Sequence, residues 1–264
     1  MPQPQQPPIP AATIRWQRGV AALALAAVAA CVLRRVDVKP RGTAGAPPPR
    51  VVNAQRMVPQ TLALGPLPSA GGGSLSVSAY GDSRDELVLT VHGQNPALVN
   101  EWEETKIAQS LAERGFYVVC TNMHSNEKTK PGTLSPGGFA AVMDELLAVL
   151  QRDSCVLMGK SWGGRNAVAF AAARPKAVRR LVLSAPAFGM DPDADAPIIA
   201  KLSMPVLLGW SEDDTVIPYR THEAYTNASG VNVQFASYAS GGHMIIPEFG
   251  SAVLAFLGEP PAKL

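Results

Sequence analysis

The stretch SCVLMGKSWGGRNAVAFAAA, residues 154–173, reads as an apolar strand, a glycine-rich turn and an alanine-rich helix. Within it, Gly159, Ser161 and Gly163 follow the spacing G-x-S-x-G. Side chains two positions before and after the serine would collide in so tight a turn, and glycine also tolerates unusual backbone angles. We therefore expect Ser161 at the head of a helix, where free N–H groups and the helix dipole favour a developing negative charge.

This spacing is typical of a nucleophile elbow. Because a five-residue pattern often matches by chance, the assignment depends mainly on the strand–turn–helix context. Gly159-Lys160-Ser161 also matches the end of a phosphate-binding P-loop. That motif requires a glycine five positions before Gly159, where the chain has Ser154, and a loop that is missing here. The sequence therefore favours a nucleophile over a nucleotide site.

Composition indicates one folded domain with a basic N-terminal segment. The chain has 264 residues, of which 47% are hydrophobic, enough for a core. Residues 1–81 hold eight Lys or Arg and one acid, so the other 15 basic and 20 acidic residues carry a net charge of −5. Basic residues do not alternate with aromatic ones in a patch, and nucleic-acid binding is not expected. Three scattered cysteines predict neither a disulfide framework nor a zinc site.

Residues 1–57 are predicted to be an N-terminal targeting or anchor segment with a Pro-rich linker, and residues 58–264 the folded domain. The apolar run 19–33 has arginines at both ends and is shorter than the roughly 20 residues of a membrane span. The run fits the apolar core of a cleaved targeting sequence, and a retained membrane anchor is the alternative. Residues 15–35 are therefore a candidate for membrane association. Organelle import, secretion or anchoring is expected rather than the plain cytosol, and the sequence does not choose between them.

Strand and helix patterns alternate along the folded part. Strand-like runs lie at 74–80, 86–91, 116–121, 155–158, 178–184, 205–209 and 233–238. Helical patterns lie at 102–114, 139–150, 165–173, 219–225 and 247–257. Such alternation predicts an α/β protein whose mostly parallel sheet has helices on both faces.

Four motifs, each at the end of an expected strand, resemble those of the α/β-hydrolase superfamily. They are His92-Gly93-Gln94, similar to its oxyanion loop, the elbow at Ser161, the stretch 210–218, similar to its acid loop, and Gly241-Gly242-His243. The order Ser, Asp, His is the one expected for that fold. The resemblance covers about residues 60–260 and implies a single-domain α/β-hydrolase fold.

The resemblance also implies roles for these residues. Ser161 would be the nucleophile, His243 the base that takes its proton, and Asp214 the acid that orients the imidazole. The backbone N–H groups of Trp162 and Gln94 would form the oxyanion hole. Structural roles are expected for the remaining motif residues, His92, Gly93, Gly159 and Gly163.

Two adjacent aspartates compete for the place beside His243. The family's acid loop commonly reads Asp, two residues, an aliphatic residue and Pro. The stretch from Asp214 to Pro218 matches this spacing, whereas the stretch that begins at Asp213 is one residue too long. Asp213 is then expected to face solvent or to cap a backbone N–H group. Asp191 or Asp193, later than the strand at 178–184, would be the acid if neither served.

Many relatives carry a lid, but the 20 residues from 185 to 204 leave room for at most a short helix. The expected protein is a lidless serine hydrolase that cleaves an acyl ester or thioester of small size, without metal or organic cofactor. Two alternatives remain open: an amide deacylase or acyltransferase of the same fold, and a non-catalytic relative that binds a ligand or partner. The acyl group and the oligomeric state are not predicted.

Overall fold

The computed structural model describes residues 58–70, 72–94, 100–123, 136–245 and 247–260. The predicted N-terminal segment, with its apolar run, lies outside these residues. Within them, no helix combines the length and apolar character needed to cross a membrane.

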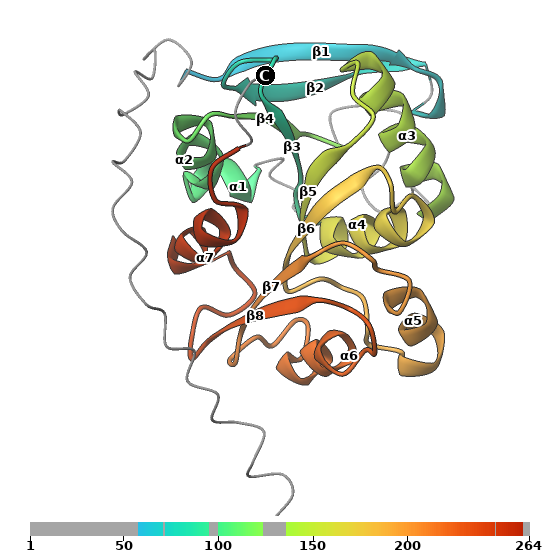
Figure 1. Ribbon diagram of the computed structural model, residues 1–264, viewed down its shortest axis with the longest axis vertical. Helices are drawn as coiled ribbons and strands as arrows, with labels where there is room; N and C mark the ends of the chain where they lie inside the picture. Colours follow the sequence, from blue (N-terminus) through green and yellow to red (C-terminus); the bar gives the residue numbers. More distant parts are fainter. Residues whose placement is uncertain (1–57, 71, 95–99, 124–135, 246, 261–264) are drawn as a thin grey trace, which may run out of the picture. The chain divides into compact units, whose positions relative to one another are not determined.

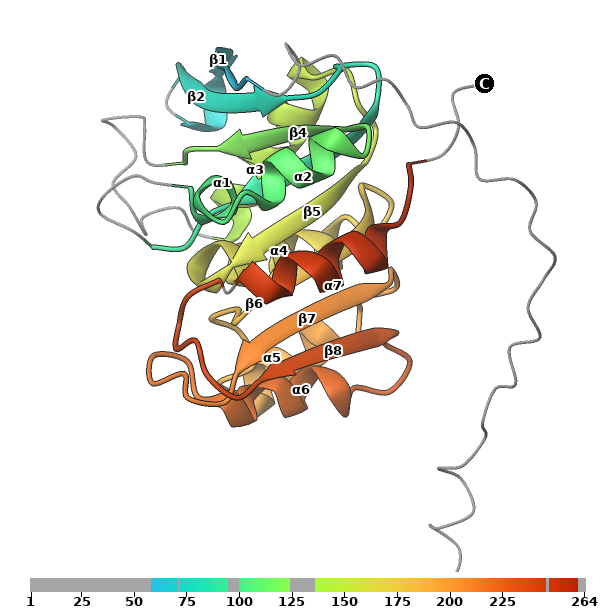
Figure 2. The same ribbon diagram turned by 90° about the vertical axis from the view of Figure 1, so that its left-hand side faces the viewer.

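Eight strands form one sheet within the described residues, in the order β1-β2-β4-β3-β5-β6-β7-β8 (Figures 1 and 2). The strands are β1 Gln60–Leu67, β2 Gly73–Tyr80, β3 Glu86–Val91, β4 Phe116–Thr121, β5 Cys155–Lys160, β6 Val178–Ser184, β7 Val206–Ser211 and β8 Val233–Tyr238. β2 pairs antiparallel with β1 and β4, and the other pairs are parallel. The mostly parallel sheet expected from the sequence is thus confirmed, and its parallel strands end at one edge.

Helices cover both faces of the sheet (Figure 1). One face carries α1 Glu101–Glu104, α2 Ile107–Glu113 and α7 Pro247–Leu257, and the other α3 Pro136–Val149, α4 Ser161–Ala173, α5 Pro192–Ile199 and α6 Glu223–Thr226. Each face has its own apolar core, because the central strands send alternate side chains to opposite sides. Cys120 and Cys155 belong to these cores, and burial raises the pKa of the Cys155 thiol to about 12.

Three details differ from the sequence-based expectation. The edge strand β1 was not expected, because Gly65-Pro66 interrupts its strand pattern and its register shifts between Leu64 and Leu67. The single helix expected over 102–114 is wrong, since Lys106 takes a left-handed φ of 59° and divides it into α1 and α2. The helix expected over 219–225 is a 3-10 turn, Tyr219–His222, followed by α6.

The segment between β6 and β7 holds one short helix, α5, as expected. Asp191 caps it, accepting from the Ala194 N–H at 3.3 Å, and Pro192 opens it. Among the described residues no lid domain stands over the carboxyl edge of the sheet.

Candidate active site

Ser161 lies at the junction of β5 and α4 in a strained backbone conformation. Its φ is +51°, although the preceding Lys160 is extended at −114°. A non-glycine residue in the left-handed region costs on the order of 1–3 kcal/mol and persists only where the surroundings hold it. The turn is therefore held by its neighbours, as the elbow pattern predicts.

Glycines allow this turn to pack closely. A Cβ on Gly159 would lie 2.7 Å from the Gly163 carbonyl oxygen. A Cβ on Gly163 would collide with the carbonyl oxygens of His92 and, at 2.6 Å, Val91. The elbow thus lies directly against the carboxyl end of β3, where the His92-Gly93-Gln94 loop begins.

Gly163→Ala is expected to lower both stability and turnover, because its methyl group would push the elbow away from backbone atoms that cannot move aside. Overpacking of this kind typically costs about 1–3 kcal/mol. Thermal unfolding and ester hydrolysis measure the two effects. Gly250→Ala in α7 is the matched control, since there a Cβ meets only the flexible Ile107 side chain and alanine favours the helix. Equal melting temperatures for Gly163→Ala and the wild type would contradict this packing.

Two hydrogen bonds link Ser161, at the start of α4, with His243 and Asp214, which come from two separate loops. Ser161 Oγ is 2.8 Å from His243 Nε2, and His243 Nδ1 is 2.8 Å from Asp214 Oδ2. The carboxylate only accepts, so Nδ1 carries the proton and donates it to Asp214. In the neutral imidazole, Nε2 is then the acceptor that faces the serine hydroxyl.

The adjacent aspartates make different contacts. The second oxygen of Asp214 accepts from the N–H groups of Val216 and Ile217, at 2.8 and 2.9 Å, which fixes the carboxylate plane. Asp213 instead accepts from the N–H groups of Gly241 and Gly242, at 3.3 and 2.8 Å. Asp213 therefore caps the loop that carries His243, one of the two outcomes expected from the sequence, and Asp214 is the residue that meets the imidazole.

The His92-Gly93-Gln94 loop begins where β3 ends. His92 is buried, its Nδ1 donates to the Gly93 carbonyl oxygen at 2.5 Å, and burial lowers its pKa. It is thus a buried ring tied to its own loop, which agrees with a structural role. Gln94 is exposed, and Trp162 packs edge-on against Phe139.

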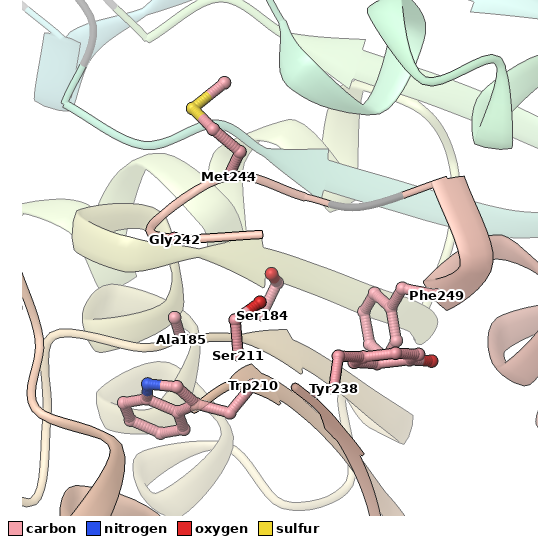
Figure 3. A pocket seen from close by; sticks show the side chains of 9 residues that line it. Ser184, Ala185, Trp210, Ser211, Tyr238, Gly242, Met244 and Phe249 are labelled. Carbon is pink, nitrogen blue, oxygen red and sulfur yellow. The ribbon is translucent and has the colours of Figure 1, made fainter. Parts of the chain in front are cut away.

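A small pocket lies beside the His243 loop (Figure 3). Gly242 and Met244 line it from that loop, and the hydroxyls of Ser184 and Ser211 point into it from the ends of β6 and β7 (Figure 3). Its other lining residues are Ala185, Gly209, Trp210, Tyr238 and Phe249. The described residues contain no group of three or more His, Cys, Asp or Glu side chains that could hold a metal ion.

Sequence reasoning missed one buried pair beside this site, Lys160 and Glu101. In the sequence, Lys160 belongs to the stretch that resembles a P-loop, and Glu101 is the residue before the helical pattern at 102–114. A pair 59 residues apart, formed by two charged residues without a motif, leaves no pattern in the sequence. Its only signal was a lysine at the end of an otherwise apolar strand.

Residues 86–201 match the family model described as alpha/beta hydrolase fold. No curated protein sequence matches the chain. Among solved structures, a predicted CIB-like hydrolase from Thermoplasma acidophilum is 18% identical, with a TM-score of 0.63 over 76% of this chain and 98% of that one. The thioesterase domain from the curacin biosynthetic pathway is 15% identical, with a TM-score of 0.60 over 76% of this chain and 99% of that one.

A carboxylesterase from Bacillus subtilis, CesB, is 16% identical, with a TM-score of 0.61 over 78% of this chain and 95% of that one. Identities this low establish a shared fold and leave activity and substrate to be argued from the site. The family match over residues 86–201 and the similar structures together show that the chain has an α/β-hydrolase fold.

Proposed function

We propose that this protein is a serine hydrolase that cleaves an acyl ester or thioester through a covalent acyl-enzyme on Ser161. The observation that carries the proposal is the pair of 2.8 Å hydrogen bonds that aligns Ser161, His243 and Asp214. The esterase and thioesterase activities named for similar folds agree with it.

In the first half-reaction, Ser161 Oγ attacks the carbonyl carbon while its proton passes to His243 Nε2. Asp214 stabilises the imidazolium and keeps the proton on Nδ1. The bond from the carbonyl carbon to the leaving oxygen or sulfur then breaks, and the leaving group takes the proton from Nε2. Ser161 is left as an acyl ester.

In the second half-reaction, the oxygen of a water molecule attacks the acyl carbon while His243 takes a proton from that water. The bond to Ser161 Oγ breaks, the serine recovers its proton, and a carboxylic acid leaves. In both halves the negative oxygen would accept from the N–H groups of Trp162 and Gln94. This role is supported by the packing of Gly163 against His92, which brings the elbow and the loop together.

Short acyl chains are the expected substrates. In the described residues no lid encloses the site, and the hydrophobic side chains of Val216 and Met244, close in sequence to Asp214 and His243, are largely exposed. A fully enclosed methylene group would contribute about 0.8 kcal/mol, roughly fourfold in affinity. We therefore expect kcat/KM for p-nitrophenyl esters to level off beyond short chains. A steady rise of about fourfold per methylene from two to twelve carbons would indicate an enclosed acyl tunnel instead.

A fluorophosphonate probe tests the proposal. It should label the wild-type protein and not Ser161→Ala, and the labelled protein should lose ester hydrolysis in parallel. A folded wild-type protein that neither reacts nor hydrolyses any acyl ester or thioester would favour a non-catalytic, ligand-binding role. Labelling combined with turnover of amides alone would favour the amide deacylase.

A further inference from the structure

A buried ion pair lies between the elbow and the His92-Gly93-Gln94 loop. Lys160 is 6% exposed and Glu101 is 3% exposed, and Lys160 Nζ is 3.1 Å from Glu101 Oε1. The second oxygen of the same carboxylate, Oε2, accepts the Gly93 N–H at 3.1 Å. One carboxylate therefore joins a residue next to Ser161 to a residue next to Gln94.

The position of Glu101 is set by the residues on either side of it, the N-cap Asn100 and Trp102 of α1. The Asn100 side chain accepts from the Trp102 N–H at 3.2 Å and donates to the Thr121 carbonyl at the end of β4. Trp102 donates its indole N–H to the Val91 carbonyl at the end of β3. Since the residues on both sides are tied to strand ends, the carboxylate between them has little freedom to move.

Gly93 packs tightly on the ion pair. A Cβ there would lie 2.9 Å from Lys160 Cδ and 3.1 Å from Glu101 Oε1. The absence of a side chain lets the Gly93 backbone reach the carboxylate. The lysine is held in this contact with Glu101.

We propose that Glu101, held by Lys160, positions the oxyanion loop by gripping the Gly93 N–H, so that the Gln94 N–H points at the developing oxyanion. Both are positioning residues, and the inference rests on the function proposed above. A buried ion pair is a costly route to stability, because apolar residues of similar size often do as well. Its geometry here, with one oxygen on the lysine and the other on a loop N–H, serves alignment instead. Misplacement of an oxyanion donor affects the transition state more than substrate binding.

Two double variants separate alignment from stability. Single substitutions would leave a buried charge without its partner and could prevent folding. Lys160→Met/Glu101→Gln removes both charges but keeps an amide oxygen that can accept the Gly93 N–H. Lys160→Met/Glu101→Leu removes both charges and the acceptor. The comparison therefore isolates one hydrogen bond.

We expect Lys160→Met/Glu101→Leu to lower kcat for a short ester by about 100-fold, the effect of losing one oxyanion donor, with KM changed less than threefold. Lys160→Met/Glu101→Gln should retain kcat within about tenfold of the wild type. Hydrogen exchange at the Gly93 amide should be slow in the wild type and the Gln variant and fast in the Leu variant. Equal kcat in the two folded doubles, or losses that only follow their melting temperatures, would overturn the inference.

Hydrogen exchange does not depend on turnover, which keeps the two proposals distinguishable. In one outcome, the wild-type protein neither hydrolyses esters nor reacts with fluorophosphonate, while the Gly93 amide is protected in the Gln double variant and not in the Leu double variant. That outcome would refute the proposed function and support the positioning role of Glu101. An active wild-type protein, together with equal Gly93 exchange in the two double variants, would refute only the positioning role of Glu101.

Discussion

Ser161→Ala is expected to lower kcat for an activated ester by about 10⁶-fold, to the level left by binding and the oxyanion donors. Removal of the nucleophile from a serine triad has an effect of this size, since in the proposed mechanism His243 and Asp214 act only through Ser161. The hydroxyl hydrogen-bonds to His243 Nε2 at 2.8 Å, and the loss of this bond should leave the fold intact. Initial-rate kinetics with p-nitrophenyl acetate measure the effect.

Thermal unfolding of Ser161→Ala provides the control. Its melting temperature should stay near that of the wild type, because alanine leaves the packing at this buried position nearly unchanged. Ser184→Ala, which removes a hydroxyl from the neighbouring pocket, should leave kcat within about tenfold. Comparable losses in both variants would mean that turnover depends on the pocket rather than on Ser161 as nucleophile.

Asp214→Asn is expected to lower kcat by about 10⁴-fold while the adjacent Asp213→Asn costs less than about tenfold. An amide at 214 can donate to Nδ1, which stabilises the imidazole tautomer with its proton on Nε2. In that tautomer Nε2 cannot accept a hydrogen bond from Ser161. An amide at 213 keeps an oxygen that can accept the Gly242 N–H. Both substitutions remove one negative charge, so the pair controls for charge.

The reverse order of losses would assign the acid to Asp213. Equal and mild losses would mean that neither aspartate assists His243. The structure uses Asp191 to cap α5, through the Ala194 N–H. Kinetics of both variants at one pH, with melting temperatures to confirm folding, are sufficient.

The sheet could be predicted largely from the sequence because buried parallel strands appear as short apolar runs between helical patterns. The exceptions are local. β1 could not be predicted because Gly65-Pro66 interrupts the pattern of this edge strand, whose outward residues are exposed. The break between α1 and α2 escaped because Lys106, an ordinary helix former, adopts a left-handed conformation that no local pattern indicates.

The candidate site divides in the same way. Ser161, Asp214 and His243 lie within short motifs, so their approach to one another could be predicted once the motifs were assigned to strand ends. The contact of Asp213 with Gly241 and Gly242 needs the relative position of two loops. The Lys160–Glu101 pair needs the packing of α1 against the end of β5, which neither residue type indicates by itself.

The most direct test of the account is to trap the acyl-enzyme. Wild-type protein mixed with excess p-nitrophenyl acetate and quenched in acid within the first turnover should gain one acetyl group, and peptide mass spectrometry should place it on Ser161. A burst of nitrophenol close to one equivalent should accompany it if deacylation is the slower step. An acetyl group on another residue, lost on its substitution and retained in Ser161→Ala, would contradict the assignment of the nucleophile.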